Sequence, residues 1–589
     1  MKRISYIIMM VLMAGVSSVF TSCGDFLDQE SDRVIPADKD HLNNASDTLY
    51  SVIGVMNKMQ ALADRTILLG ELRGDLSDVV SGTTADLREI SNFNISTENQ
   101  YNSPRDYYAV INNCNYFLAK ADSTLKNSRN ELVFRKEIAA VKGFRAWTYL
   151  QLALNYGKVP FVTTPILNKD DADKQYEMKD VKDICNYFVA DLAPYANEET
   201  PNYGTIRNND SKLFYFPIYV LMGDMYLWAG NYKESALCYY KYLSTRNGSN
   251  SAYPIGTSAS QWMKEDIKWN LKNVAWTNGF GTEANMPTSE LITEIPGDSI
   301  PAEGNYSKLR DYFTSSSSNN YEVSIVASKA LYHLSESQKY CHLNSDNEVI
   351  YAPDNLQDNE TGDLRFSSIY ADLSSRIIVN GNKVDHYVMN EKYLTQNVHI
   401  YRRTMVYLRL AEALNRAGFP RFAFAILKTG VNNSVIESDV LPYYPDDEAY
   451  LRQFDFPDNR YKLRTKASGS DENTIGIHSH GSGWTEYNDY YLYPEKDNLQ
   501  EEEDAVEDLI IDEGALEFAF EGTRFYDLMR VALRRNDPSY LANKVYARRG
   551  KDNEAEMRSL IQVDLNDTNN WYLNWDGKIG LGKLFNSEK

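Results

Sequence analysis

The stretch that most constrains this 589-residue chain lies near its end, at residues 505–534. Its apolar residues recur at helical spacing as far as residue 520, and a second apolar series begins at Phe525. Gly522 stands between the two series and suits a helix C-cap, because glycine readily adopts the left-handed conformation that ends many helices. The pattern therefore predicts two helices that meet at a tight turn.

Charged side chains are set into the same surface. Glu517 and Glu521 are four residues apart, and Glu521 and Arg524 are three apart, so a continuous helical surface would place them side by side. Carboxylates beside arginines indicate either a structural ion-pair network or a general acid/base pair as in glycosidases. The second interpretation needs a carboxyl with a raised pKa, whereas nearby arginines lower it. We therefore expect Glu517, Glu521 and Arg524 to form a structural network.

The segment EFAFEGTRFYDLMR, residues 517–530, also resembles the C-terminal signature of the RagB/SusD family of outer-membrane lipoproteins from Bacteroidetes. In the glycine-rich turn at 476–494, His480 stands where the family pattern leads us to expect an arginine. Other segments that resemble the family follow in the same order along nearly the whole chain: DFLD at 25–28, LLGELRGDLSDVV at 68–80, the exit from the helix at 157–161, and SKALYHLSESQKY at 328–340.

Two segments, 223–243 and 401–427, carry glycine, alanine and aromatic residues at the offsets of tetratricopeptide repeats. Because they are far apart in the sequence, they can stack only if the chain between them loops out. The predicted fold is mostly α: a tetratricopeptide-like helical solenoid with large, irregular, loop-rich insertions, which would present a broad contact surface.

This organisation divides the chain into consecutive segments. In order, we predict a signal peptide (1–22), a lipidated tether (23–45), a helical repeat region (46–245), a loop-rich insertion with a candidate ligand site (246–399), a helical repeat (400–435), a second irregular insertion (436–504), a C-terminal helical hairpin (505–545) and a C-terminal segment (546–589).

The amino-terminal sequence predicts a signal peptide followed by a lipidation site. Lys2 and Arg3 precede a mostly apolar run, and small residues then lead to Cys23, as in a bacterial lipobox. We expect Cys23 to be the acylated first residue of the mature chain, so that the lipid is the protein's only attachment to the membrane. The alternative is a cysteine that merely falls near an ordinary signal-peptidase site.

Composition and motifs exclude several functions. A formal net charge of −21 argues against nucleic acid or an anionic membrane as the partner. The five cysteines form no CxxC, so a zinc site is not expected, and those at positions 114, 185 and 238 suit core thiols. We find no hydrolase, metalloprotease, phosphate-binding or dinucleotide-binding motif, and expect no catalytic residue, metal or cofactor.

Aromatic residues on the irregular stretches suggest a sugar-binding platform. A ring can stack on the face of a pyranose while neighbouring Asn and Asp bind its hydroxyl groups; the alternative is that these rings pack the loops against the solenoid. In known family members, the loop after the second helix contributes to the binding face, and the resemblance therefore adds Phe93 and Asn94 as candidates. The expected ligand-binding residues are Phe93, Asn94, Trp276, Tyr306, Tyr312, Tyr321 and Trp484.

The resemblance implies a non-catalytic lipoprotein on the outer face of the outer membrane. Such a protein captures a glycan and delivers it to a SusC-like TonB-dependent transporter, with the solenoid bound to the transporter as a lid. The acidic composition favours a neutral oligosaccharide over a polyanionic one. The alternatives are a peptide-binding member of the same family, a surface glycosidase, and an adhesin or scaffold that uses the solenoid without a small ligand.

Overall fold

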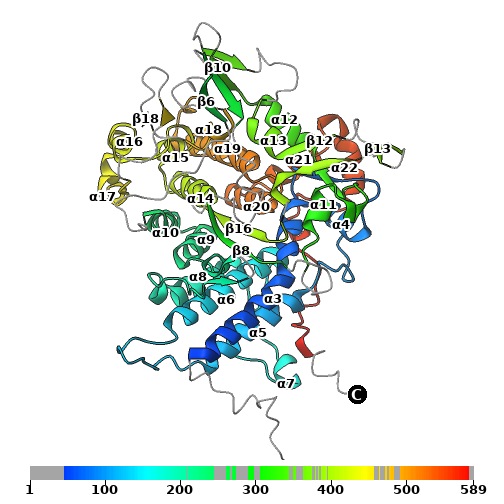
Figure 1. The fold of residues 1–589 in the computed structure, drawn as a ribbon, viewed down its shortest axis with the longest axis vertical. Helices are drawn as coiled ribbons and strands as arrows, with labels where there is room; N and C mark the ends of the chain where they lie inside the picture. Colours follow the sequence, from blue (N-terminus) through cyan, green and yellow to red (C-terminus); the bar gives the residue numbers. More distant parts are fainter. Residues whose placement is uncertain are drawn as a thin grey trace, which may run out of the picture.

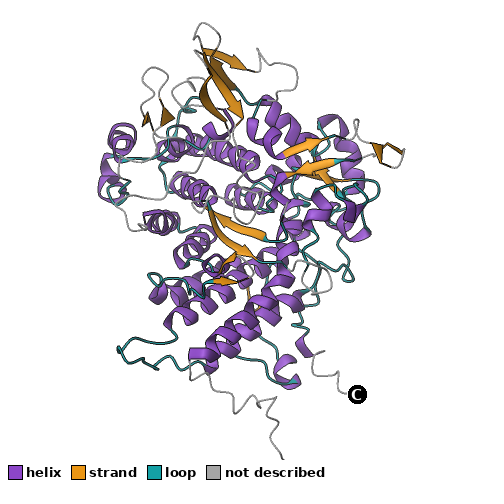
Figure 2. Ribbon diagram, in the orientation of Figure 1, coloured by secondary structure: helices purple, strands orange, loops and turns teal. Residues whose placement is uncertain are grey.

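The computed structural model describes residues 45–206, 209–244, 260–265, 268–273, 290–297, 306–343, 349–352, 362–373, 378–379, 382–383, 386–393, 395–456, 463–464, 471–473, 476–482 and 491–582. Figures 1 and 2 show a mostly helical protein, and the strands of this part of the chain form small two-stranded ladders. The predicted fold class is thereby confirmed. Among the described residues, no helix is long and apolar enough to cross a membrane.

The longer helices build the body of the molecule, with shorter helices between them. The α-helices are α3 (Ala45–Glu71), α4 (Ala85–Ser91), α5 (Pro104–Lys120), α6 (Arg135–Tyr156), α7 (Lys169–Ala172), α8 (Val181–Leu192), α9 (Ile218–Ala229), α10 (Tyr232–Ser244), α11 (Leu309–Phe313), α12 (Lys329–Ser337), α13 (Leu364–Ile369), α14 (Arg403–Arg416), α15 (Pro420–Lys428), α16 (Asn433–Val435), α17 (Glu448–Leu451), α18 (Ser479–Ser482), α19 (Leu499–Phe518), α20 (Arg524–Arg535), α21 (Ser539–Tyr546) and α22 (Glu554–Leu560).

Each described strand pairs with one other in antiparallel fashion. The pairs are β1 (Ser77–Val79) with β9 (Ile325–Ala327), β2 (Val159–Pro160) with β3 (Met178–Lys179), β4 (Thr205–Ile206) with β5 (Asn209–Asp210), β6 (Ser260–Glu265) with β7 (Lys268–Asn273), β8 (Leu291–Ile295) with β16 (Val398–Arg402), β10 (Tyr340–Leu343) with β11 (Val349–Ala352), β12 (Tyr370–Asp372) with β15 (Val388–Asn390), β13 (Ile378–Val379) with β14 (Asn382–Lys383), and β17 (Leu463–Arg464) with β18 (Asp471–Asn473).

The two repeat-like segments stack on each other. α9 packs on α10, α10 packs on α14, and α14 packs on α15, so the second segment continues the stack that the first begins. The pairing of β8 with β16 brings the chain back to the stack. At Gly223 an added Cβ would lie 2.5 Å from the Tyr239 ring, so the glycine allows α9 and α10 to approach closely.

The predicted C-terminal hairpin consists of α19 and α20. Its turn differs in detail from the expectation, because Ala519 is the C-cap of α19, and both Phe520 and Gly522 adopt positive φ values of 69° and 74°. An added Cβ at Gly70 would lie 1.7 Å from the carbonyl oxygen of Gly522, so α3 passes directly over this turn. The C-terminal signature is therefore packed against the first described helix.

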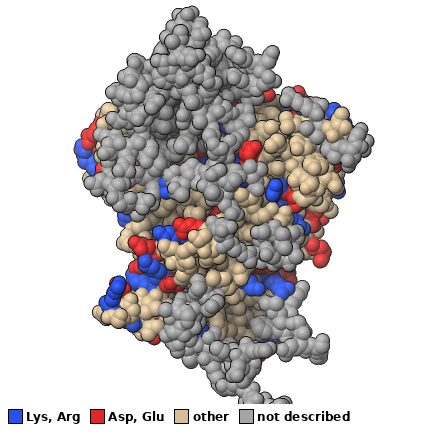
Figure 3. All heavy atoms as spheres, viewed as in Figure 1, with Lys and Arg blue, Asp and Glu red and all other residues tan. Residues whose placement is uncertain are grey.

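The described cysteines are buried as predicted, and charged side chains of both signs lie on the surface. The described cysteines at positions 114, 185 and 238 are buried and free of disulfides. Figure 3 shows basic and acidic side chains next to each other over the described part of one face. Local pairing of charge, rather than the net charge alone, therefore decides what this surface can bind.

Candidate functional site

A cleft of about 230 Å³ lies where α3, the loop after α4, and the segments next to β8, α11 and β16 meet. Figure 1 shows α3 running past the ends of β8 and β16 toward α4 and α11. A cavity of about 150 Å³ can hold benzene, so the cleft has room for one six-membered ring with its substituents. Its polar lining includes Gln60, Asp64, Arg65, Gln100, Tyr306 and Gln396.

Asp64 connects α3 to the segment that precedes α11. Its Oδ1 accepts a hydrogen bond from the Ser307 hydroxyl at 2.6 Å, and its Oδ2 accepts one from the Lys308 backbone N–H at 2.8 Å. Burial raises the pKa of Asp64, although the hydrogen bonds and the Lys308 charge oppose this rise. A carboxylate offers about four lone-pair sites, so Asp64 keeps the capacity to accept further hydrogen bonds in the cleft.

Arg65 fixes the loop that follows α4. Its guanidinium donates to the carbonyl oxygens of Gln100 and Ser103, at 3.4 and 3.2 Å, and pairs with the Asp106 carboxylate at 2.7 Å. The Arg65 side chain is 4% exposed, and its Nε–H is buried with no hydrogen-bond partner among the described residues. Leaving a buried donor unpaired costs roughly 1–3 kcal/mol, and Nε is enclosed by protein atoms rather than open to the cleft.

Gln396 supplies an unpaired acceptor in the same cleft. Its side-chain amide is hydrogen-bonded to Tyr306, while its Oε1 is buried without a partner in the described part of the chain. An added Cβ at Gly297 would lie 2.2 Å from the backbone oxygen of Gln396, so the end of β8 presses directly on this residue. Both unpaired atoms, Arg65 Nε and Gln396 Oε1, are therefore enclosed by the protein, whereas the side chain of Tyr306 is partly exposed.

Two tyrosines join the loop after α4 to α11. The hydroxyl oxygens of Tyr101 and Tyr312 are 3.1 Å apart, and the two residues are 6% and 9% exposed. Tyr101 lines the cleft, whereas Tyr312 is not among the lining residues and contacts it through the Tyr101 hydroxyl. Tyr306 lines the cleft itself and is only partly buried, so part of its side chain is open to a ligand.

The cleft brings together only part of the ligand-binding set predicted from the sequence. Tyr306 lies in the cleft and Tyr312 next to it, whereas Tyr321 stacks on Tyr387 with the ring centroids 6.2 Å apart. Asn94 is exposed in the loop after α4 but does not line the cleft. The remaining predicted residues Trp276 and Trp484, and the lipidation site Cys23, lie outside the described residues.

The expectation that Phe93 offers its ring to a ligand is corrected. Phe93 is 8% exposed, and its ring packs on Phe525 with the centroids 5.9 Å apart. Its φ of 56° turns the chain at the end of α4. Because the ring packs in the core, it is not available to stack on a ligand.

The sequence analysis missed the side chains that α3 contributes. Gln60 and Asp64 are four residues apart, so they lie on the same side of the helix, and both line the cleft. Gln60 also donates from Nε2 to the Pro296 carbonyl oxygen at 2.7 Å, next to β8. A polar pair at this spacing within a long amphipathic helix is the signal that could have identified them.

A buried ion-pair network surrounds Glu517. One oxygen of this carboxylate lies 2.8 Å from Arg402 Nη1, and the other lies 3.0 Å from Arg365 Nη1. The second oxygen is also 3.1 Å from His480 Nδ1, so the histidine that departs from the family pattern contacts the network. All four side chains are at most 1% exposed.

Glu521 and Arg524 belong to different ion pairs. Glu521 contacts Arg402 at 2.9 Å and Lys392 at 2.5 Å, whereas Arg524 contacts Asp75. The sequence expectation that Glu521 and Arg524 are neighbours on one helical surface is wrong, because α19 ends before Glu521. The turn sends the two side chains toward different parts of the structure.

These carboxyl groups are held in their ionised form. Burial alone would raise the pKa of Glu517, but His480, Arg402 and Arg365 outweigh it and hold the pKa well below its usual range. Glu513 behaves in the same way, and its pKa falls to about 2 because of Arg365 and His478. A general acid requires the opposite shift, and Glu517 is fully buried. The arrangement suits a stabilising network and does not suit glycoside hydrolysis.

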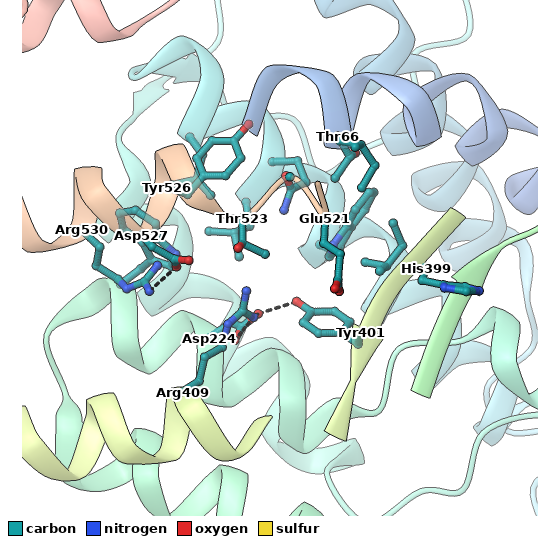
Figure 4. Close-up of a pocket in the computed structure, with 18 residues that line it drawn as sticks. Thr66, Asp224, His399, Tyr401, Arg409, Glu521, Thr523, Tyr526, Asp527 and Arg530 are labelled. Atoms are coloured by element: carbon teal, nitrogen blue, oxygen red, sulfur yellow. Dashed lines mark hydrogen bonds and ion pairs between the residues drawn. The ribbon is translucent and has the colours of Figure 1, made fainter. Parts of the chain in front are cut away.

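A second, smaller cavity lies between the repeats and the C-terminal hairpin. Figure 4 shows Tyr401 and Arg409 directed at Asp224, with Asp527 beside Arg530. The ion pairs Arg409–Asp224 and Arg530–Asp527 measure 2.6 and 2.7 Å. The cavity is about 60 Å³, well below the roughly 150 Å³ that holds benzene. It suits a few ordered water molecules rather than a sugar ring.

Comparison with known proteins finds a family model and a relative that are similar to parts of this chain. Residues 480–574 match the model of the SusD family. The SusD-like protein P2 of Formosa agariphila is 25% identical over 238 residues, which is 40% of this chain and 44% of that protein, so the chain spans less than half the length of this relative.

Solved structures share the fold over most of the chain. A SusD superfamily protein from Bacteroides vulgatus has a TM-score of 0.56 at 14% identity and covers 90% of this chain and 96% of its own. One from Bacteroides thetaiotaomicron has a TM-score of 0.54 at 17% identity, with 90% and 99% covered. A laminarin-binding SusD-like protein has a TM-score of 0.52 at 17% identity, with 89% and 99% covered. The C-terminal family match, the SusD-like relative and the shared fold together confirm the predicted resemblance to the RagB/SusD family.

Proposed function

We propose that this protein captures an oligosaccharide in the cleft beside α3 and delivers it to a TonB-dependent transporter of the outer membrane. The observation that carries the proposal is the cleft itself. It is large enough for one sugar ring, Tyr306 lies partly exposed within it, and Gln60, Asp64 and Gln100 add polar side chains to its lining. Tyrosine combines an apolar ring with a polar hydroxyl, and a few placed polar groups fix a ligand's orientation.

The relatives support a carbohydrate ligand. The structure described as laminarin-binding has the same fold, and so does a SusD-like carbohydrate-binding protein from Bacteroides fragilis. Because these similarities lie below 25% identity, they support the class of ligand and not its identity. The cleft of this chain supplies the local chemistry on which the proposal rests.

The protein acts without catalysis in this proposal. The carboxylates of the C-terminal signature are enclosed in ion pairs, so a glycan in the cleft does not reach them. Acylated Cys23 would tether the protein to the outer face of the membrane, with the stacked helices available to the transporter. A bound glycan would then favour the closed assembly only if it binds that state more tightly than the open one.

Binding of glycans by the mature protein tests the proposal. Isothermal titration with a panel of plant, algal and host oligosaccharides should find a ligand, and Tyr306→Ala should weaken its binding several-fold because a contacting ring is lost. Tyr443→Ala is the matched control, since Tyr443 is 53% exposed and stacks on Arg421 away from the cleft. The control should bind like the wild type.

The alternative functions predict other outcomes of the same experiment. Binding of peptides without any glycan would make the protein a peptide-binding member of the family. Breakdown of the glycan during titration would favour a glycosidase. Tight binding to a large surface protein, without any small ligand, would favour an adhesin or scaffold.

A further inference from the structure

We infer that the surface around Tyr443 binds a protein segment that presents an arginine side chain among apolar residues. This Tyr443 surface consists of Arg421 on α15 together with residues 442–448 and 491–503. These residues line neither the cleft beside α3 nor the smaller cavity next to the C-terminal hairpin. The surface therefore serves a second partner and does not depend on glycan capture.

Large apolar side chains are exposed on this surface. Tyr443, Leu492 and Leu499 are 53%, 66% and 49% exposed. Leu499 is the first residue of α19 and lies three residues before Glu502, so the two share one side of the helix. The Glu502 carboxylate accepts a hydrogen bond from the Tyr493 hydroxyl at 2.8 Å, which joins the start of α19 to the segment that carries Leu492. Exposed apolar groups with a polar rim mark protein interaction sites.

Arg421 shows how this surface binds a guanidinium group. Its guanidinium lies over two tyrosine rings, 3.8 Å from the centroid of Tyr443 and 4.2 Å from that of Tyr493. Its Nη2 also lies 3.2 Å from a carboxylate oxygen of Glu495. Because Arg421 covers one face of the Tyr443 ring, the exposure of this ring comes from its other face and its edges. The outer face can therefore take a second guanidinium in the same way.

The charge of the surface favours a cationic partner. Residues 442–448 and 491–503 carry eight acidic side chains and a single basic one, Lys496. The exposed acidic residues are Asp446, Glu448, Glu495, Asp497 and Glu501. Arg421, Lys496 and the two bases that pair with this surface, Lys233 and Arg452, leave the acidic groups in excess. A cationic segment is therefore attracted, and an anionic membrane is repelled.

Arginine fits the surface better than lysine does. A guanidinium is planar, so it can stack on Tyr443 and also donate to a carboxylate, as Arg421 does with Glu495. An ammonium is a compact, strongly hydrated charge that feels the same field but does not stack as a plane. Apolar neighbours of the partner's arginine would cover Leu492 and Leu499. The surface thus distinguishes an arginine among apolar residues from a polycation in general.

Peptides that differ only in their charged residue test the inference on the mature protein. The probes are fluorescein-labelled repeats of Gly-Arg-Leu, of Gly-Lys-Leu and of Gly-Glu-Leu, all of the same length. Fluorescence anisotropy should show that the arginine peptide binds about threefold more tightly than the lysine peptide, as an exposed cation–π contact provides. The glutamate peptide should not bind. Tyr443→Ala should remove the difference between the arginine and lysine peptides and leave the melting temperature unchanged.

A pair of charge reversals separates this surface from the net charge of the protein. Glu495→Lys should weaken binding of both basic peptides several-fold, because it places a cation where the partner's cation binds. Glu177→Lys is the matched control and should bind like the wild type. The two glutamates are 75% and 74% exposed, and each pairs with one base, Arg421 or Lys179.

Several results would overturn the inference while leaving glycan capture intact. These are failure of the arginine peptide to bind, equal binding of the arginine and lysine peptides by the wild type, an unchanged difference in Tyr443→Ala, and equal losses in the two glutamate variants. Loss of glycan binding in Tyr443→Ala, without binding of any peptide, would make the surface a sugar subsite instead. Glycan binding without any effect of these variants would leave the proposed function standing on its own.

Discussion

Arg524 and Asp75 form a two-point ion pair across 449 residues of sequence. Arg524 Nε lies 2.6 Å from one Asp75 oxygen, and Nη2 lies 2.9 Å from the other. The two side chains are 3% and 7% exposed, and Arg524 also donates to the Ile511 carbonyl oxygen at 3.0 Å. The pair therefore fastens the start of α20 to the chain that follows α3.

Asp75→Asn should destabilise the fold strongly. The substitution leaves the Arg524 charge buried without its counter-ion, and breaking a buried pair in this way costs roughly 3–5 kcal/mol. Urea unfolding followed by circular dichroism would measure the loss. Glu199→Gln is the control, because its pair with Lys136 is exposed and should contribute nothing measurable. Equal unfolding midpoints for Asp75→Asn and the wild type would contradict a stabilising role for the pair.

Glu521→Gln should lower the melting temperature and leave glycan binding unchanged. Glu521 bonds both Arg402 and Lys392, and these two cations hold its pKa below the usual range in spite of burial. Loss of the charge leaves both cations with one fewer counter-ion. Calorimetry and titration on the same preparation would separate the two effects. Unchanged stability together with abolished glycan turnover would assign Glu521 to catalysis instead.

The helical framework could be predicted because its signals are local. Apolar spacing indicated the hairpin of α19 and α20, and the two repeat-like segments indicated a stack that the intervening chain leaves and rejoins. The packing of α10 on α14 follows the same logic. Periodicity is a property of neighbouring residues, so one sequence is enough to reveal it.

Ion-pair partners could not be predicted, because they depend on where the chain turns. Spacing rules assume a continuous helix, whereas the positive φ values of Phe520 and Gly522 break it between Glu517 and Arg524. Glu521 and Arg524 consequently meet partners far away in the sequence. The residue types therefore indicated an ion-pair network, but the sequence did not indicate which residues pair with each other.

The cleft could be predicted only in part, because separate segments of the chain build it. Tyr306 and Phe93 are both aromatic residues on loops, and nothing in their local sequence distinguishes them. The backbone at Phe93 turns its ring onto Phe525, while Tyr306 lines the cleft. Asp64 and Gln396 come together in the lining of the cleft only through the tertiary fold.

Glu71 should make stability depend on pH near neutrality. It is fully buried at the end of α3, and its Oε2 accepts a hydrogen bond from Gly522 N at 3.2 Å. Burial raises the pKa of Glu71 from 4.5 to about 7. Between these values the folded protein binds more protons than the unfolded chain, so the free energy of unfolding falls as pH rises, by about 3 kcal/mol in all.

Glu71→Gln should remove that part of the pH dependence. The variant cannot ionise at this position, so its unfolding free energy should fall less between pH 5 and pH 8 than that of the wild type. Urea unfolding at pH 5 and pH 8 would measure how much the unfolding free energy of each protein changes between the two pH values. Each protein serves as its own reference. The same fall in both proteins would show that Glu71 does not titrate in this range.

Cys23→Ala should release the protein from the membrane fraction. A basic start, an apolar run and small residues that end at Cys23 predict that this residue carries the lipid. Without the acyl chains, nothing predicted from the sequence would hold the chain on the membrane. Fractionation with antibody detection would measure the release. Mass spectrometry that finds an unmodified mature start at another residue would contradict lipidation at Cys23.

Trp276 and Trp484 should contribute to glycan affinity, although both lie outside the described residues. They belong to the loop-rich insertions and not to the repeats, where aromatic residues such as Tyr239 are buried between helices. Loops on a rigid scaffold commonly carry binding sites. A stacked ring contributes on the order of 0.5–1.5 kcal/mol beyond its buried area, taking aromatic pairs as the guide.

Trp276→Ala and Trp484→Ala should therefore each weaken binding several-fold, and the double variant should lose more than either alone. Melting temperature and association with the transporter should stay at wild-type values, because neither residue belongs to the repeat segments of the sequence. Isothermal titration with the glycan that binds the wild type would measure the loss. If the double variant binds as tightly as the wild type, the aromatic platform lies on other loops, and the cleft around Tyr306 would have to supply the affinity by itself.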